Sequence, residues 1–406
     1  MVDNEFTGLS AQDDPSFYNP DFSLIEDEIS SLDSSELQND PLLQSINYDN
    51  YILLSKKELS EFLRVIEPWS KVTTDSYGKC VRVTCPYKDQ VLLQYANLPN
   101  QISTICINKS EKTVPEFFIQ IELIKKILSE SYTSVAFVYE NNEMNIALLD
   151  KLLFIETLPL SSEIYTTPPI DSPLTSQVDI EKANYIFKKM SFMLNLADRV
   201  SEKVMIIRDD KVIVNTNAFV AEFDSPFSSP LQATLYKTVT DTLGLFTELA
   251  KTSIVTNFSR DMKMLHISVD GKLEAHLSII SDIEQFLSPR VDALLNFTPN
   301  ITIQNDIILR LAQVATSFDY LNNTLSFNLQ PDLLKVSIVS SDLTRKTDYD
   351  LQITSPSQIT PSEIKLGSKL LKSCLEALGG ISKYHLSPQG LGLSTDVGKV
   401  LICRQS

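Results

Sequence analysis

The sequence lacks the signals that mark a membrane protein or a secreted protein. No run of about 18 apolar residues occurs, which argues against a transmembrane helix. The first ten residues carry no basic side chain, so they do not resemble the positively charged start of a secretory signal. The 5 cysteines among 406 residues show no metal-ligand spacing, and their low, odd number favours a reduced, cytoplasmic compartment.

Catalytic motifs are also missing. The chain has no HExxH, GxSxG, GxxxxGK[ST] or GxGxxG sequence, and Gly390-Leu391-Gly392 is typical of a turn that enters a strand. The 3 histidines, His266, His276 and His385, are interpreted as satisfied or surface side chains. With no nucleophile, metal cluster or phosphate loop in view, we predict neither an enzyme nor a cofactor or metal site.

Basic residues are scarce, and the acidic excess is unevenly placed. The net charge is −17, but residues 1–50 hold twelve acidic and no basic side chains. We predict that this stretch is a disordered acidic tail. The alternative is a partner-binding or DNA-mimicking segment, because residues 22–37 have a weak amphipathic helical pattern. The rest of the chain is only mildly acidic, so its bases can gather on one surface.

A chain of this length suits three domains of roughly 130 residues each, and one pattern does recur three times. An amphipathic helix is predicted from Ser55, from Asp179 and from Asp306. Taking Lys56, Glu181 and Asp306 as equivalent starts, the repeat is 125 residues in both steps. Short alternating strands follow each helix, namely residues 79–85, 91–96 and 103–108, then 203–209, 211–216 and 219–224, then 324–329, 333–340 and 348–354.

A second helix then completes each unit. Pro115, Pro230 and Pro361 each precede an extended stretch and a helical pattern, and Asp270-Gly271 marks a type I′ hairpin turn in the strands that follow. Every unit therefore has the predicted order α-βββ-α-βββ, an α+β fold class. We predict domains over residues 51–160, 178–285 and 300–406, with a proline-rich surface connector over 158–177 and a less clear boundary near 288–304.

This triple order resembles the DNA sliding clamp of the bacterial β-clamp type, a polymerase processivity factor. The resemblance covers roughly residues 51–406 and is best in IKLGSKLLKSCLEAL (364–378) and in the last strand, VLIC (400–403). It implies that the helices line a ring and that the sheets form its outer wall. The acidic start and the unfamiliar end, Arg404-Gln405-Ser406, depart from the family and suggest a divergent version, for example one encoded by a phage.

In such a ring the helices face double-stranded DNA, and Lys and Arg hold it through phosphate contacts that do not depend on sequence. The expected DNA-binding residues are Lys56, Lys57, Arg64, Lys125, Lys126, Lys182, Lys188, Lys189, Arg199, Lys237, Arg310, Lys369 and Lys372. Three domains per chain imply a homodimer that completes six, closed by edge strands between the first domain of one chain and the third of the other.

The resemblance also implies partners and a docking site. A DNA polymerase and a clamp loader would insert short hydrophobic peptides between the second and third domains, in a pocket mapped to Thr216, Phe219, Ala221, Leu401 and Cys403. We expect a cytoplasmic location in a bacterial or phage-infected cell. Two alternatives stay open: a non-ring accessory factor for replication or transcription with the same fold, and a phage structural or interaction protein with no DNA role.

Overall fold

The computed structural model of the chain describes residues 49–130, 133–148, 151–165, 170–171, 173–197, 199, 203–280, 289–303, 307–317, 323–330, 333–340, 346–353, 362–379, 383–396 and 398–404. The predicted acidic tail, residues 1–50, lies outside the described residues except for its last two. No helix within the ranges is long and apolar enough to span a membrane.

Three units of the same order follow one another, and in each the motif strand, helix, three strands occurs twice. The first unit contains β1 (Tyr51–Ser55), α3 (Lys56–Ser70), β2 (Cys80–Tyr87), β3 (Gln90–Asn97), β4 (Asn100–Ile107), β5 (Phe117–Gln120), α4 (Ile121–Glu130), β6 (Ser134–Glu140), β7 (Glu143–Leu148) and β8 (Lys151–Phe154).

The second unit repeats this order. It contains β9 (Leu174–Gln177), α5 (Ile180–Leu196), β10 (Val204–Asp209), β11 (Lys211–Asn215), β12 (Phe219–Asp224), β13 (Leu231–Tyr236), α6 (Lys237–Leu249), β14 (Ile254–Phe258), β15 (Met264–Val269) and β16 (Leu273–Ser278). The short helix α7 (Pro289–Leu295) follows it.

The third unit has the same ten elements. They are β17 (Ile301–Thr302), α8 (Ile307–Ser317), β18 (Thr324–Gln330), β19 (Leu333–Val339), β20 (Lys346–Gln352), β21 (Ser362–Gly367), α9 (Ser368–Leu378), β22 (Lys383–Ser387), β23 (Gly390–Ser394) and β24 (Gly398–Cys403). The mixed, repeated fold class predicted from the sequence is confirmed.

The strands form four antiparallel sheets, two of which run continuously from one unit into the next. Their orders are β1-β6-β7-β8, β5-β2-β3-β4-β16-β15-β14-β9, β13-β10-β11-β12-β24-β23-β22-β17 and β20-β19-β18-β21. Pairing of β4 with β16 joins the first two units, and pairing of β12 with β24 joins the last two. Backbone hydrogen bonds therefore hold the units to one another.

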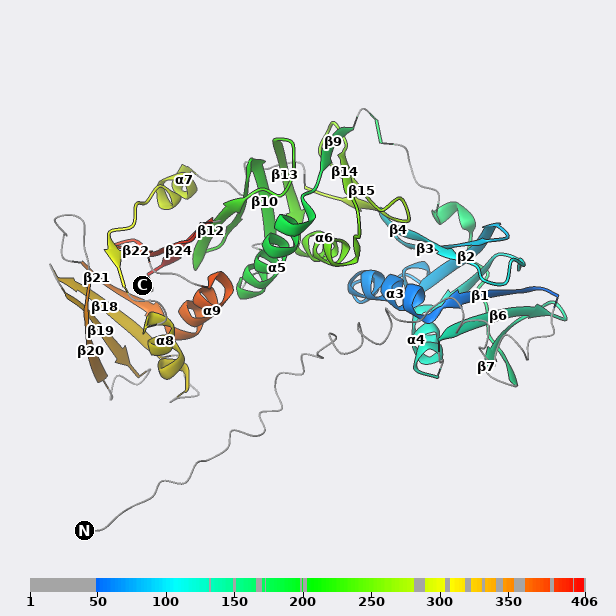
Figure 1. Ribbon diagram of the computed structural model, residues 1–406, viewed down its shortest axis with the longest axis horizontal. Helices are drawn as coiled ribbons and strands as arrows, with labels where there is room; N and C mark the ends of the chain where they lie inside the picture. Colours follow the sequence, from blue (N-terminus) through cyan, green and yellow to red (C-terminus); the bar gives the residue numbers. More distant parts are fainter. Residues whose placement is uncertain are drawn as a thin grey trace, which may run out of the picture.

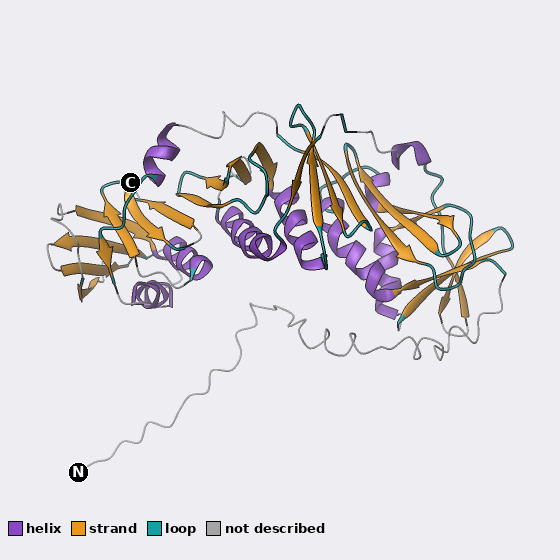
Figure 2. Cartoon of the chain, turned by 45° about the horizontal axis from the view of Figure 1, so that its top comes forward, coloured by secondary structure: helices purple, strands orange, loops and turns teal. Residues whose placement is uncertain are grey.

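The helices cover the inner faces of these sheets. In α3, Leu59, Phe62, Leu63 and Ile66 recur at helical spacing and are buried in one large core with residues of the strands. Figure 1 shows the units side by side in an arc, with the long helices toward its concave side and the sheets toward its convex side. Figure 2 shows the same separation from a second direction.

Three details differ from the sequence-based prediction. The structure contains the helices and strand triplets of the predicted order α-βββ-α-βββ and adds a strand before each opening helix, namely β1, β9 and β17. The predicted extended stretches form β5, β13 and β21. The strands before the opening helices are short. In β1, Tyr51–Leu54 is apolar throughout and buried on both faces, so this strand has no alternating pattern by which it could be recognised.

The connector over residues 158–177 is the second difference. Its residues Ser162–Tyr165 form a 3-10 turn in which Tyr165 is buried against Phe118, and its last four residues form β9, which pairs with β14. The third difference is that α5 ends at Leu196, so Arg199 lies beyond the helix. The boundary near 288–304 contains the strand β17 and the helix α7.

Candidate nucleic-acid interface

The predicted DNA-binding residues lie on the helices of the concave side, apart from Arg199. Helix α3 carries Lys56, Lys57 and Arg64, and α5 carries Lys182, Lys188 and Lys189. The remaining helical cations are Lys125 and Lys126 on α4, Lys237 on α6, Arg310 on α8, and Lys369 and Lys372 on α9. The structure thus distributes the cations over all six long helices, as a surface that follows a phosphate backbone requires.

Five of these cations are paired with acidic residues. The carboxylate of Glu248 on α6 forms ion pairs with Arg64 of α3 and, at 3.4 Å, with Lys188 of α5. Lys125 contacts Glu67 and Glu122 at 3.1 Å each, and its hydrogen bond lowers the pKa of Glu67. Lys237 pairs with Asp241, and Lys372 lies 3.9 Å from Glu376. The acids partly neutralise the concave face and hold these cations in place.

Other cations have no such partner. Among the described residues, no acidic side chain forms an ion pair with Lys57, Lys126, Lys182, Arg199, Arg310 or Lys369. Lys189 lies over the ring of Tyr185 at 5.2 Å, and burial lowers its pKa. These side chains are available to phosphates without breaking an ion pair to a described residue.

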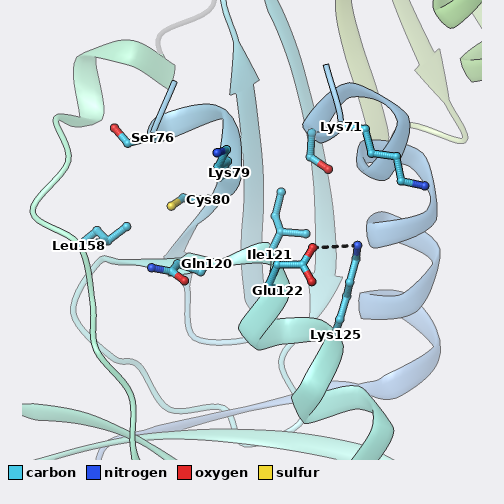
Figure 3. Close-up of a pocket in the computed structure, with 10 residues that line it drawn as sticks. Lys71, Ser76, Lys79, Cys80, Gln120, Ile121, Glu122, Lys125 and Leu158 are labelled. Carbon is cyan, nitrogen blue, oxygen red and sulfur yellow. Dashed lines mark hydrogen bonds and ion pairs between the residues drawn. The ribbon is translucent and has the colours of Figure 1, made fainter. Parts of the chain in front are cut away.

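A cavity of about 450 Å³ opens in the first unit between the end of α3 and the start of α4. Figure 3 shows Lys71, Lys79 and Cys80 around it, with Lys125 paired to Glu122 at its rim. Burial raises the pKa of Cys80 to about 11, so its thiol is protonated at neutral pH. The lining therefore offers cations but no activated nucleophile.

A second cavity, of about 370 Å³, lies where the first two units meet. Lys57, Lys251 and Lys272 line it together with Glu58 and Glu61, and burial raises the pKa of Glu58. The carboxylate of Asp270 also lines it and accepts hydrogen bonds from the backbone N–H groups of residues 251–253. Charges of both signs meet there, so the cavity does not select an anion.

The first junction has polar contacts on both its helix side and its sheet side. Trp69 of α3 donates its indole N–H to the hydroxyl of Thr242 on α6 at 2.9 Å, and both residues are buried. Arg64 and Glu248 connect the same two helices. On the sheet side, Ile105 donates its N–H to the carbonyl of Lys272 at 3.0 Å. Hydrogen bonds and ion pairs thus fix this junction.

The second junction is closed by an apolar cluster on its outer side. Helix α7 packs Val291, Leu294 and Leu295 onto the sheet, where they meet Leu401 of β24. The other members of this outer cluster are Ile206, Ile213, Val220 and Phe297. Arg208 on β10 also holds Asp292 of α7 at 2.6 Å.

The five residues predicted to form a peptide pocket are not brought together in one open cavity. Phe219 and Ala221 are fully buried in the large core on the helix side, whereas Leu401 belongs to the outer cluster on the opposite face. Thr216 is buried and hydrogen-bonds to the backbone of Phe219, and only Cys403 is partly exposed. The alternation of neighbouring side chains explains the split, because Phe219 pairs with Ile402 and Val220 with Leu401. The peptide-site role of the set stays a prediction.

The histidines separate into two groups. His385 is satisfied as expected, because its Nδ1–H donates to the carbonyl of Thr298 at 2.7 Å and its ring stacks on Phe297. For His266 and His276 that interpretation holds only in part, although Asn257 Nδ2 does lie 3.2 Å from His266 Nδ1. The two histidines lie opposite each other on β15 and β16 beside Glu274, and His266 Nε2 and His276 Nδ1 are buried without a hydrogen-bond partner among the described residues.

Comparisons with known proteins bear on the fold alone. No family model matches the sequence, and no curated protein matches it. Solved structures do match. The Caulobacter crescentus β sliding clamp aligns with a TM-score of 0.72 at 9% identity, over 88% of this chain and 99% of that one.

Two further structures agree. The DNA polymerase III subunit β from Pseudomonas aeruginosa aligns with a TM-score of 0.71 at 12% identity, over 87% of this chain and 99% of its own. The Helicobacter pylori β clamp bound to a DNA ligase peptide aligns with a TM-score of 0.70 at 12% identity, over 88% and 100%. The chain therefore has the sliding-clamp fold along most of its length, as the resemblance predicted.

Proposed function

We propose that two copies of this chain close into a ring of six domains that encircles duplex DNA without reading its sequence and tethers a DNA polymerase. In this role the protein catalyses no reaction; it holds its partners on DNA. The observation that supports the proposal most directly is the way in which the units already pair within one chain.

Both internal junctions use equivalent strands. The last strand in the first half of one unit pairs with the last strand in the second half of the next, as β4 does with β16 and β12 with β24. By the same rule, β20 is the last strand in the first half of the third unit and β8 is the last strand in the second half of the first unit, and these two remain to be paired. Among the described strands, β8 pairs only with β7 and β20 only with β19, so each has an open edge.

An open edge strand is an association site unless it is covered. On β8, Leu153 is 51% exposed and Phe154 61% exposed, and such apolar side chains favour burial against a partner. Pairing β8 of one copy with β20 of the other, twice by one two-fold axis, repeats the internal junctions and makes a closed homodimer. The six domains then present their helices to the enclosed space.

The cations on those helices suit a duplex that must slide. Phosphate attraction is independent of sequence and falls with salt, and no element of the chain needs to enter a groove. Acidic partners on α3, α4, α6 and α9 limit the total positive charge, which keeps the attraction weak enough for movement along DNA. Lys57, Lys126, Lys182, Arg199, Arg310 and Lys369 are the side chains that we assign to phosphate contacts first.

Sedimentation equilibrium of the full chain tests the closure. We expect twice the chain mass of 45.6 kDa for the wild type at micromolar concentration. Phe154→Lys should give the single-chain mass, because it places a charge in the paired edge. Leu174→Lys is the matched control, since Leu174 is also exposed on an edge strand, β9, and should leave the dimer intact. A wild-type monomer, or equal effects of both variants, would contradict the proposed closure.

Retention on DNA tests the encirclement. Protein assembled on a closed circular plasmid and then passed into high salt, where phosphate attraction is screened, should stay on the circle and leave after the plasmid is cut. Phe154→Lys should leave both forms. A protein that dissociates equally from circular and linear DNA would instead be a non-ring DNA-binding factor.

We place the docking of polymerase peptides at the outer cluster beneath α7, where the second and third units meet. A short helix is the cover that a docking peptide could displace to reach Leu401 and its neighbours. Val291→Asp should abolish stimulation of primer extension by a DNA polymerase while the dimer persists. Full stimulation by that variant, with the dimer intact, would refute this placement.

A further inference from the structure

We propose that His266, His276 and Glu274 bind one divalent transition-metal ion of the zinc class on the convex face of the sheet that joins the first and second units. This site lies on the side of the sheet opposite the helices, so it does not depend on DNA binding or on ring closure.

The hairpin β15–β16 places the two imidazoles together. His266 and His276 are directly paired across the strands, and their rings stack with centroids 4.3 Å apart and planes at 28°. Three residues, Asp270 to Lys272, separate the paired Val269 and Leu273. A two-residue loop would have paired His266 with Ala275 and placed the histidines on opposite faces, so the extra residue creates the cluster.

Glu274 supplies a carboxylate to the same face. Its Oε2 lies 4.0 Å from His266 Nε2, and one ligand atom from each of the three residues can be chosen so that all lie within 4.8 Å of one another. Tetrahedral zinc at about 2.0–2.1 Å from each ligand would hold these atoms about 3.4 Å apart. Small side-chain rotations close that gap without moving the strands.

The hydrogen bonding of the cluster is incomplete without a ligand. His266 Nε2 and His276 Nδ1 are buried and have no hydrogen-bond partner within the described ranges. Buried polar atoms are usually satisfied, and two unsatisfied ring nitrogens beside one carboxylate are what a cation would complete.

Outer contacts can orient the ligands. On β14, the amide Nδ2 of Asn257 lies 3.2 Å from His266 Nδ1, and its Oδ1 accepts a hydrogen bond from the hydroxyl of Thr175 on β9 at 2.8 Å. When His266 ligates through Nε2, its Nδ1 carries the proton. The Asn257 amide must then turn over, so that Oδ1 accepts from His266 Nδ1 and Nδ2 donates to the Thr175 hydroxyl; a second hydrogen bond of this kind is typical of metal-bound histidine. Glu274 is 46% exposed, which leaves an entry path and an open fourth position for water.

Two histidines and one carboxylate select the metal class. Imidazole suits Zn²⁺, Cu²⁺, Ni²⁺ and Fe²⁺, whereas Mg²⁺ and Ca²⁺ require oxygen ligands throughout. The bound ion would cross-link β15 and β16 next to β4, where His276 pairs with Gln101 of the first unit. The site therefore stabilises the sheet at the first junction.

Equilibrium dialysis of the reduced, full-length protein against Zn²⁺ tests the site. We expect one ion per chain in the wild type and none at the same concentration in the His266→Gln/His276→Gln double variant. His385→Gln is the matched control and should bind like the wild type, because His385 is already bonded to Thr298. No binding by the wild type, or equal binding by the double variant, would overturn the proposal.

Glu274→Gln covers the case in which the double variant fails to fold. This change keeps both rings and alters an exposed side chain, so the fold should persist, while zinc affinity should fall at least about tenfold. Zinc should also raise the thermal unfolding midpoint of the wild type by at least about 2 °C and leave that of Glu274→Gln nearly unchanged. Equal affinity and equal midpoint shifts in the two proteins would refute the site.

Discussion

The two internal junctions use the same strand pairing but are secured by different interactions. At the first, Trp69 and Thr242 share a buried hydrogen bond between helices, and Glu248 joins Arg64 to Lys188. At the second, α7 seals the outer face with an apolar cluster that includes Leu401. The comparison teaches that backbone pairing sets the geometry of every junction, while side chains determine how each responds to salt, pH and truncation.

The largest effect is expected at the second junction, called the apolar junction here because α7 covers it with apolar side chains. Leu401→Ala removes a side chain that is 1% exposed and leaves a cavity between β24 and α7, which should lower the free energy of unfolding by about 2–4 kcal/mol. Urea unfolding measures this. Leu174→Ala, at a site 48% exposed, should change the same quantity by less than about 0.5 kcal/mol. A loss under about 1 kcal/mol at Leu401 would mean that the cluster contributes little to the junction.

A smaller loss of unfolding free energy is expected at the first junction, the polar junction, when its buried hydrogen bond between α3 and α6 is removed. Trp69→Phe should cost about 1–2 kcal/mol of unfolding free energy, since Thr242 then keeps only its bond to Thr238. A double-mutant cycle with Thr242→Val should return a coupling of about 1 kcal/mol. Zero coupling would show that the contact does not stabilise the junction.

Acid should also weaken the turn that the second unit brings to the first, polar junction, where Asp270 accepts hydrogen bonds from residues 251–253 of the same unit. Burial alone would raise the pKa of Asp270, but N–H groups of Lys251, Ser253 and Thr252 and the Thr252 hydroxyl hold it far below its ordinary value. Because the folded pKa lies below the unfolded one, this stabilisation is complete above about pH 4 and is lost as the pH falls further.

Asp270→Asn isolates that contribution, because Asn also tolerates the positive φ of this turn. At pH 7 and pH 5 the variant should be less stable than the wild type by about 1 kcal/mol. At pH 2–3 the difference should shrink. Trp69, the only tryptophan of the chain, reports the unfolding of this junction by fluorescence. A difference that does not depend on pH would contradict the assignment to the carboxylate.

The smallest effect concerns DNA. Glu248→Gln releases Arg64 and Lys188 toward the concave face, so duplex affinity should rise about two- to fivefold at low salt and converge with that of the wild type at high salt. Stability should change by less than about 1 kcal/mol. Glu143→Gln, which removes the same charge on the β6–β7 hairpin, is the control and should leave affinity unchanged. Fluorescence anisotropy on duplexes of unrelated sequence measures both variants.

The helices and most strands could be predicted because their patterns are local. Asp179, where the second opening helix was predicted to start, caps α5, with its side chain accepting from the N–H of Lys182. Asp270 and Gly271 both adopt the positive φ of the predicted turn. The strands β1, β9 and β17 escaped prediction because Leu174–Gln177 and Ile301–Thr302 are too short to show a period, and β1 is buried on both faces.

Side-chain neighbours across strands could not be predicted, because they depend on register. One extra residue at Lys272 brings His266 opposite His276, and the pairing of Val220 with Leu401 places Phe219 on the other face of the sheet. Ion pairs between units, such as that of Arg64 with Glu248, join residues 184 positions apart in sequence and depend on how the units dock. Such contacts leave no local signal in one sequence.

Electron microscopy of the purified protein in negative stain tests the central claim most directly. If β8 and β20 close the dimer as the internal junctions do, micromolar samples should show closed rings with six lobes and a central opening, and Phe154→Lys should show single three-lobed arcs. Wild-type particles that are arcs or open filaments under the same conditions would contradict the account.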